Sequence, residues 1–260
     1  MTDRTAGLHD YLESLARNSS ERWTVSACGV TGSRQNIPAL LDKDAYARAS
    51  NTVPVLLISG LSGQVDDVSL AWHALELFQA PDSGLAIHIG LSAIPNCNPD
   101  GRRDLSAGYP PTDNFFNDTD EPEKRYLWRW ICFQGPSLVL ELRSGESVRW
   151  QSNDAGGSLA SVLASPVDSV ENESLLAALG TGSPDGLGPI PGLRLTTPMD
   201  DLGDELRRLW KALSDQPDLG GASPARQALE ARAARSYLEV ARTLAKVYGY
   251  QLDPVNYTQG

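Results

Sequence analysis

The sequence predicts an α/β fold in which a mixed, mostly parallel central sheet carries helices on both faces. Continuous apolar segments, which are typical of strands buried on both faces, alternate along the chain with segments of helical periodicity. Between residues 53 and 95 a strand, a helix and a second strand follow one another directly, which is the order of a βαβ unit with parallel strands. This alternation indicates a layered α/β sandwich.

The N-terminal part predicts a helix and a β-hairpin. Residues 5–17 place three leucines and a tyrosine at helical spacing, and the polar residues 18–20 end this helix. Segments 22–30 (RWTVSACGV) and 36–44 (NIPALLDKD) have strand character, and the turn-rich TGSRQ joins them.

The central part contains the buried strands. Segment 53–60 (VPVLLISG) predicts a strand, 68–78 a helix, and 85–95 (LAIHIGLSAIP) a second strand. A further helix is expected over 121–133, followed by another buried strand at 137–142 (SLVLEL).

The C-terminal part changes in composition. Residues 145–192 are rich in Gly, Ser and Pro, which predicts long loops with one short helix near 173–179. A last strand is expected at 192–198 (GLRLTTP), followed by helices at 200–213 and 223–250. We expect one domain over residues 1–260, since this length suffices for a single sizeable core.

The amino-acid composition limits the kinds of binding partner and the cellular compartment that we expect for this chain. A formal net charge of -11 argues against nucleic acid and against an anionic membrane surface, because both would be repelled. Cys28, Cys97 and Cys132 are widely spaced, which is typical of free thiols in a reducing compartment. We find no signal-peptide core and no apolar run long enough to span a bilayer, so the sequence predicts a cytoplasmic protein. The oligomeric state stays open.

One motif carries a family resemblance. Asn98-Pro99-Asp100-Gly101 is a tight turn by composition, and it follows the second strand of the βαβ unit. Before it, a strand ends in SGLSG; after it come the Asn-rich TDNFFND, a helix beginning EPEKRYLWRW, and PSLVLEL. Over roughly residues 8–145, this order resembles the zinc carboxypeptidase family, peptidase family M14. The resemblance implies a zinc-carboxypeptidase-like (phosphorylase/hydrolase-like) sandwich.

The resemblance also places the family's zinc ligands on this chain. Its first His and its Glu fall on Ser62 and Val65, and its second His falls on Arg143. Zinc needs nitrogen, oxygen or sulfur donors, and a guanidinium, which cannot be deprotonated, repels the ion. We therefore predict no zinc and no other cofactor.

Other residues near these positions are candidates for supporting or binding roles. Asp66 and Glu141 are expected beside the former zinc site, and Asp66 and Asp67 with Glu141 or Glu146 are an alternative set of oxygen ligands for a hard cation. The carboxylate-binding residues that the resemblance implies map to Arg102, Arg103, Asn114 and Asn117. His9, His73 and His88 are interpreted as structural or surface residues. No general base can be assigned.

Three functions remain open. The favoured one is a carboxypeptidase-like protein that has lost its metal and its peptidase activity, in which Arg143 pairs with Glu141, Glu146 or Asp66 or receives a carboxylate from a peptide or small acid. The alternative is an active hydrolase, with rearranged metal ligands or with Ser62 as nucleophile. The third is a protein-interaction role for the aromatic helix or the terminal helix.

Overall fold

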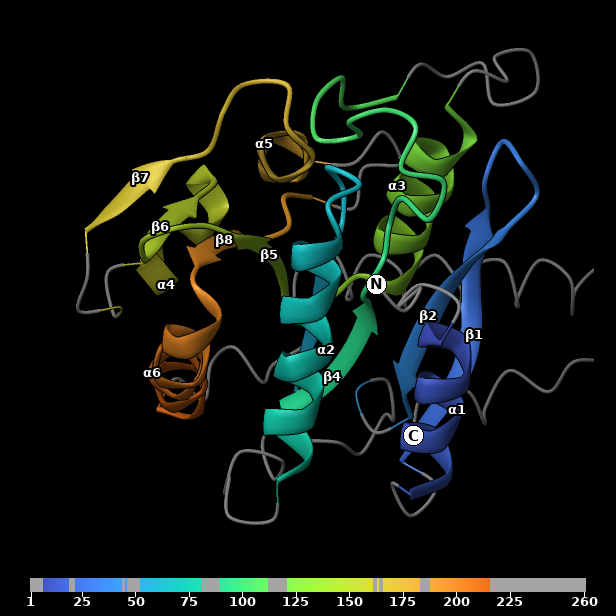
Figure 1. Cartoon of the computed structure of the whole chain (residues 1–260). Helices are drawn as coiled ribbons and strands as arrows, with labels where there is room; N and C mark the ends of the chain where they lie inside the picture. The colour runs from blue at the N-terminus through green and yellow to red at the C-terminus, as the bar shows by residue number, and fades with distance from the viewer. Residues whose placement is uncertain are drawn as a thin grey trace, which may run out of the picture.

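The computed structural model describes residues 7–18, 22–43, 45, 52–80, 89–111, 121–160, 163, 166–182 and 188–215. Within these ranges an eight-stranded sheet is flanked by helices (Figure 1). The strands are β1 (Trp23–Val30), β2 (Asn36–Asp42), β3 (Val53–Ser59), β4 (Ile89–Ile94), β5 (Leu138–Ser144), β6 (Arg149–Ser152), β7 (Val167–Ser169) and β8 (Gly192–Thr197). The helices are α1 (Leu8–Asn18), α2 (Val65–Gln79), α3 (Pro122–Gln134), α4 (Gly157–Ala160), α5 (Leu175–Thr181) and α6 (Leu202–Ser214).

The sheet is mixed, and its strand order is β1-β2-β4-β3-β5-β8-β6-β7. Strands β4, β3, β5 and β8 form its parallel centre. The β1–β2 hairpin joins β4 in antiparallel orientation, and β6 joins β8 in the same way at the other side. The predicted hairpin, βαβ unit and mostly parallel sheet are therefore confirmed.

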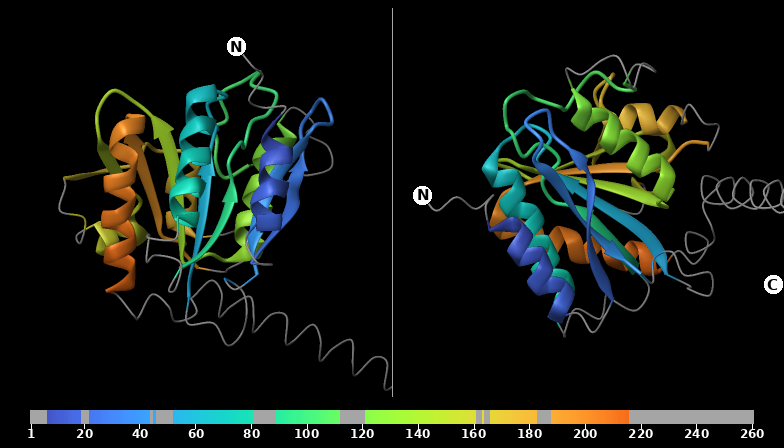
Figure 2. Two further views of the ribbon diagram at one scale, coloured as in Figure 1. Left: turned by 60° about the horizontal axis from the view of Figure 1, so that its bottom comes forward. Right: turned by 90° about the vertical axis from the view of Figure 1, so that its right-hand side faces the viewer.

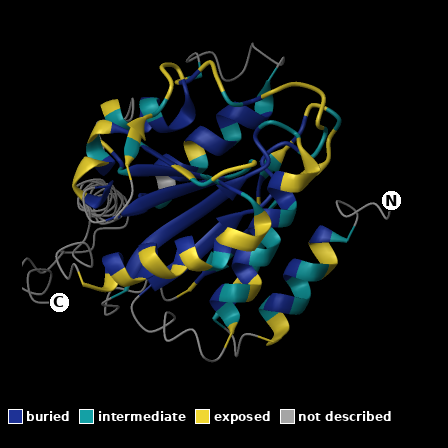
Figure 3. Ribbon diagram, turned by 60° about the vertical axis from the view of Figure 1, so that its left-hand side comes forward, coloured by how far each residue is buried: buried dark blue, intermediate teal, exposed yellow. Residues whose placement is uncertain are grey.

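The helices form two layers, one on each face of the sheet. Helices α1, α2 and α6 pack on one face, and α3 and α5 pack on the other (Figure 2). Every residue of β3 and β4 is buried, as their apolar sequences predict, and the exposed residues of the helices lie on the sides away from the sheet (Figure 3). The sheet therefore separates two apolar clusters, and neither cluster is exposed.

The segment from 145 to 192 has more regular structure than its composition predicts. The expected short helix is present as α5, but β6 and β7 also extend the sheet, and a 3-10 turn at Asp154–Gly156 leads into α4. Trp150 of β6 is buried at 1% exposure and donates from its indole nitrogen to Glu205 at 2.8 Å. The prediction of long loops is wrong for these residues, because β6 pairs with β8 and β7, and Trp150 and Gln151 of β6 are buried.

Several expectations fall on residues that the structure does not describe. These are the helix at 223–250, the first part of the strand at 85–95, His88, Asn114 and Asn117. Of the helices in the described ranges, none combines the length and hydropathy needed to cross a lipid bilayer.

Candidate functional site

The candidate site lies at the edge where the parallel strands end. Ligands of open α/β sheets bind at the carboxyl ends of the strands, where neighbouring loops diverge. Here the tips are tied together across the sheet: the amide of Cys97 donates to the carbonyl of Ser59 at 2.9 Å, and the amide of Gly145 donates to Thr197 at 3.2 Å. Residues that follow β3, β4, β5 and β8 therefore share one edge.

The Asn98–Gly101 turn is present and packs directly against the tip of β3. The Asn98 side-chain amide donates to the carbonyls of Leu61 at 3.1 Å and Arg103 at 2.6 Å. The Leu105 amide donates to the same Leu61 carbonyl at 2.9 Å. Gly63 has φ of 76°, and a Cβ there would lie 2.9 Å from the Gly101 Cα. Gly63 thus allows the close approach of the two loops, and Gly101 supplies the positive φ of 58° that the turn needs.

Ser62 and Val65 follow β3, where the family places its first two ligands. The Ser62 hydroxyl donates to Asp67 Oδ2 at 2.6 Å, and Asp67 Oδ1 accepts the Ser144 amide at 2.7 Å. Val65 is 42% exposed and has no donor atom on its side chain. The carboxylate that connects the β3 and β5 tips is Asp67, which is buried, and Asp66 is exposed. Of the two aspartates expected near this edge, Asp67 is the one whose side chain bonds both strand tips.

Arg143 lies near the end of β5 and forms an ion pair with Glu141. Its Nε donates to Glu141 Oε1 at 2.6 Å, and its side chain is 26% exposed. Of the three carboxylates expected as partners, Glu146 and Asp66 are exposed and neither bonds to Arg143 in the described part of the chain. The predicted ion pair is formed with Glu141.

A second arginine, Arg194 of β8, completes a buried charge network. Arg194 is directly opposite Glu141 in the β5–β8 register and opposite Gln151 in the β8–β6 register. Its Nε donates to Glu141 Oε2 at 2.9 Å, and its Nη1 donates to Gln151 Oε1 at 3.3 Å and also to Glu171. Burial would lower the pKa of Arg194, but the charge of Glu141 and the bond to Glu171 outweigh it and raise the pKa. Glu141 is thus held between two permanent cations.

The same network sets the acidity of Glu171. Burial alone would raise the pKa of this carboxyl, but the hydrogen bond from Arg194 outweighs it and lowers the pKa from 4.5 to about 2. A group with a depressed pKa in the folded state stabilises the fold above its unfolded pKa.

We expect this stabilisation to be lost as the pH falls from about 4.5 to about 2, in urea titrations at several pH values. The effect is small, because the Glu171 side chain is 59% exposed and water screens the charge. In Glu171→Gln this component of the pH dependence should be missing. An equal decline in both proteins would contradict the assignment.

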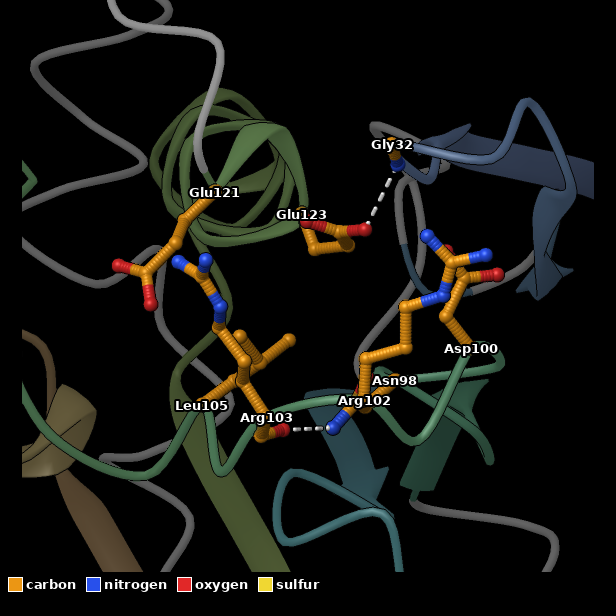
Figure 4. A pocket seen from close by; sticks show the side chains of 8 residues that line it. All are labelled: Gly32, Asn98, Asp100, Arg102, Arg103, Leu105, Glu121 and Glu123. Carbon is orange, nitrogen blue, oxygen red and sulfur yellow. Dashed lines mark hydrogen bonds between the residues drawn. The ribbon is translucent and has the colours of Figure 1, made fainter.

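Arg102 and Arg103 line a small pocket beside the Asn98–Gly101 turn (Figure 4). Its volume is about 130 Å³, below the range of drug-sized ligand sites and sufficient for a single headgroup. Burial would raise the pKa of Asp100, but the hydrogen bonds that it accepts from Ser33 and Thr31 and the charge of Arg102 outweigh this effect. The pKa of Asp100 is therefore lowered. The lining residues are Gly32, Asn98, Asp100, Arg102, Arg103, Leu105, Glu121 and Glu123. Both arginines therefore face a pocket that also contains carboxylates.

The residues at this edge do not fit zinc. A serine, a valine and an arginine stand at the three positions that the resemblance assigns to zinc ligands, and only the serine has a side-chain oxygen, which is already bonded to Asp67. Within the described ranges no group of three His, Cys, Asp or Glu residues could hold a metal ion. Strand β8, where the family's catalytic Glu is expected, has no acidic residue between Gly192 and Thr197.

The described histidines lie away from this edge. His9 of α1 and His73 of α2 have side chains that are 60% and 41% exposed, and each contacts a glutamate of its own helix. They are surface residues, as interpreted from the sequence. Ser62 therefore bonds a carboxylate and no described imidazole, which disfavours a serine nucleophile activated by histidine.

Sequence reasoning missed Arg194 and Gln151, and it named Asp67 only as a possible cation ligand and not as the carboxylate that connects the strand tips. Arg194 has a signal in hindsight, because it is a lone charge inside an apolar strand, and a buried charge requires a partner. Gln151 carries no comparable signal, since polar residues are common in short strands near the edge of a sheet.

Comparisons with known proteins agree with the fold. No protein-family model and no curated protein matches the sequence. A metallo-carboxypeptidase from Burkholderia cenocepacia has a TM-score of 0.56 at 12% identity, over 85% of this chain and 68% of that one. Carboxypeptidase A from Helicoverpa armigera has a TM-score of 0.52 at 14% identity, over 85% and 73%. A metallo-carboxypeptidase from Pseudomonas aeruginosa has a TM-score of 0.53 at 16% identity, over 84% and 69%.

The chain therefore has the metallo-carboxypeptidase fold. At these identities the similarity concerns the fold, and the function must be argued from the site.

Proposed function

We propose that this chain is a carboxypeptidase-fold protein that has lost zinc and peptidase activity, and that its sheet edge binds a carboxylate-bearing peptide or small acid. The observation that supports this most is the Arg143–Glu141 ion pair at a former zinc-ligand position, with Nε and Oε1 2.6 Å apart. A fixed positive charge at this position repels a metal cation and attracts a carboxylate.

The proposed ligand is small and anionic. Arg102 and Arg103 supply guanidinium groups on the same edge, and the pocket beside them has room for one headgroup. Bidentate pairing with a carboxylate is a frequent role of arginine. Because Cys28, Cys97 and Cys132 are all buried free thiols, we also propose a reducing compartment, such as the cytoplasm.

The first test is the metal content of the purified protein. After equilibration with excess zinc and dialysis, elemental mass spectrometry should find far less than one zinc per chain. A hydrolysis assay on blocked dipeptides and acylated amino acids should show no activity, with or without added zinc. Stoichiometric zinc that disappears in Asp67→Ala or Glu141→Ala would contradict the proposal.

Ligand binding is tested separately by calorimetry. An N-acetyl amino acid should bind, and its amide, which lacks the carboxylate, should not. We expect Arg102→Gln or Arg103→Gln to weaken binding by about tenfold or more, because each removes a charge-assisted hydrogen bond. Arg149→Gln is the matched control, since Arg149 is exposed and pairs with Asp168.

A further inference from the structure

Glu123 is a buried carboxylate that faces the pocket beside the Asn98–Gly101 turn. The residue is 8% exposed and lies in the first turn of α3. Its Oε1 accepts the backbone amide of Gly32 at 2.8 Å. No lysine or arginine of the described ranges forms an ion pair with Glu123. A buried carboxylate without a cationic partner is costly, so this one indicates a cationic group that binds there.

Arg102 and Arg103 bring positive charge to the same pocket from its opposite wall. Both are exposed residues of the loop that follows the turn, and the Glu123 carboxylate points from α3 toward the space between their guanidinium groups (Figure 4). Among the residues that the structure describes, neither guanidinium has a hydrogen bond or an ion pair. The pocket therefore offers charges of both signs to a ligand.

The other two carboxylates of the pocket already have partners in the protein. Glu121 accepts a hydrogen bond from Lys124 Nζ at 2.7 Å, and Asp100 accepts hydrogen bonds from Ser33 and Thr31. Glu123 is thus the lining carboxylate that is left for a ligand cation.

The charge balance and the size of the pocket both favour a compact zwitterion. Its cations and carboxylates are equal in number; they are Arg102, Arg103, Lys124, Asp100, Glu121 and Glu123. Glu123 would repel a simple anion, whereas a ligand with one charge of each sign keeps the pocket neutral. The volume of about 130 Å³ equals that of about four water molecules. This is room for a carboxylate and an ammonium group on neighbouring carbon atoms.

We propose that this pocket binds a free α-amino acid, with its carboxylate on Arg102 and Arg103 and its ammonium group on Glu123. The Gly32 amide holds the Glu123 carboxylate in position for this contact. The inference rests on the proposed function, which supplies the carboxylate, and deepens it by adding an ammonium group. The side chain of the amino acid extends toward solvent, because both arginines are exposed.

The test uses glycine as the probe, in NMR titrations of the isotope-labelled full chain near neutral pH. N-acetylglycine keeps the carboxylate and has no ammonium group, and glycinamide keeps the ammonium group and has no carboxylate. We expect glycine to bind more tightly than either by about tenfold or more, because each lacks one charge-assisted interaction. The amide signal of Gly32 should shift when glycine is added, since this amide donates to Glu123.

The variant Glu123→Gln separates the two charged groups of the ligand. Glutamine keeps an oxygen that can accept the Gly32 amide, but it carries no charge. Glycine binding should weaken by about tenfold or more, whereas N-acetylglycine binding should stay the same or become tighter, because a repulsive carboxylate is removed. Glu13→Gln is the matched control, since Glu13 has a 45% exposed side chain on α1, on the opposite face of the sheet (Figure 2). It should bind all these compounds as the unmodified protein does.

The outcomes distinguish this inference from the proposed function. If N-acetylglycine binds as tightly as glycine, the ammonium site is contradicted and the proposed carboxylate ligand stands. If glycinamide binds as tightly as glycine, or if none of these compounds binds, both are contradicted. Equal weakening of glycine and N-acetylglycine in Glu123→Gln would show that Glu123 acts only through the structure of the pocket, against the inference. The comparison of ligands on the unmodified protein stays decisive even if this variant does not fold.

Discussion

Replacing Arg194 with methionine should lower the free energy of unfolding by about 3 kcal/mol. Arg194 is 1% exposed and bonds Glu141, which is also 1% exposed, at 2.9 Å. Removing one member of a buried ion pair typically costs about 3–5 kcal/mol, because the remaining charge is left without its partner. The lower end applies here, since Arg143 still pairs with Glu141. Urea unfolding monitored by circular dichroism measures the difference.

The matched control is Arg149→Met. Arg149 and Asp168 form an exposed pair at 3.2 Å, with side chains that are 57% and 63% exposed. An exposed pair contributes about 0–1 kcal/mol, so this variant should unfold almost as the unmodified protein does. Equal losses for the two variants would show that the position of Arg194 in the network is unimportant.

The sheet edge can be compared with the metal centre that the fold family suggests. In the described residues, Asp67 connects the tips of β3 and β5 by hydrogen bonds at 2.6 and 2.7 Å, and Glu141 connects β5 and β8 through Arg194. A metal ion bound by residues from several loops would fix the same tips. The charge network thus provides side-chain cross-links between strands at this edge without a metal.

The central elements follow from the sequence because their signals are local. Strand β3 has a continuous apolar sequence, and the helical period expected over residues 68–78 lies within the observed bounds of α2. The Asn98–Gly101 turn follows from Pro99, which fixes its own φ, and from Gly101, which permits the positive φ of 58° found there. The order of these elements is sufficient for the fold class.

The side-chain geometry of the site does not follow in the same way. Asp66 and Asp67 are adjacent in the first turn of α2, and only the packing of that helix against β5 decides which one is buried. Arg194 and Glu141 are 53 residues apart and meet only through the β5–β8 register. Such contacts depend on tertiary structure, which composition and periodicity do not encode.

The misinterpreted segment from 145 to 192 has a physical explanation in Asn153. A Cβ on Gly180 would lie 2.9 Å from the Cβ of Asn153, and one on Gly192 would lie 2.9 Å from its Nδ2. Both glycines are therefore required by close packing around this asparagine. Glycines such as Gly180 and Gly192 predict loops from composition alone, but here they make room for the buried side chain of Asn153.

Asn153→Ala should be among the most destabilising single substitutions in the described residues, with a loss of about 4 kcal/mol. Asn153 is 4% exposed and makes four side-chain hydrogen bonds. Its Nδ2 donates to the carbonyls of Leu176 at 2.7 Å and Ile190 at 3.0 Å, and its Oδ1 accepts the amides of Gly156 at 2.8 Å and Gly192 at 2.9 Å. Each buried group left unpaired costs about 1–3 kcal/mol, and partial relaxation keeps the total below the full sum.

Two variants make this prediction specific. Asn153→Asp keeps the oxygen that accepts from Gly156 and Gly192 but places a second carboxylate oxygen against the carbonyls of Leu176 and Ile190. This variant should therefore be less stable at neutral pH. Its free energy of unfolding should recover partly when the new carboxyl is protonated. Asn36→Ala, at an exposed position of β2, should change stability by less than about 0.5 kcal/mol. Asn153 connects the end of β6 to α5 and β8, so amide hydrogen exchange in Asn153→Ala should accelerate first in these three elements. Exchange that accelerates uniformly over the whole sheet would contradict a local role of Asn153.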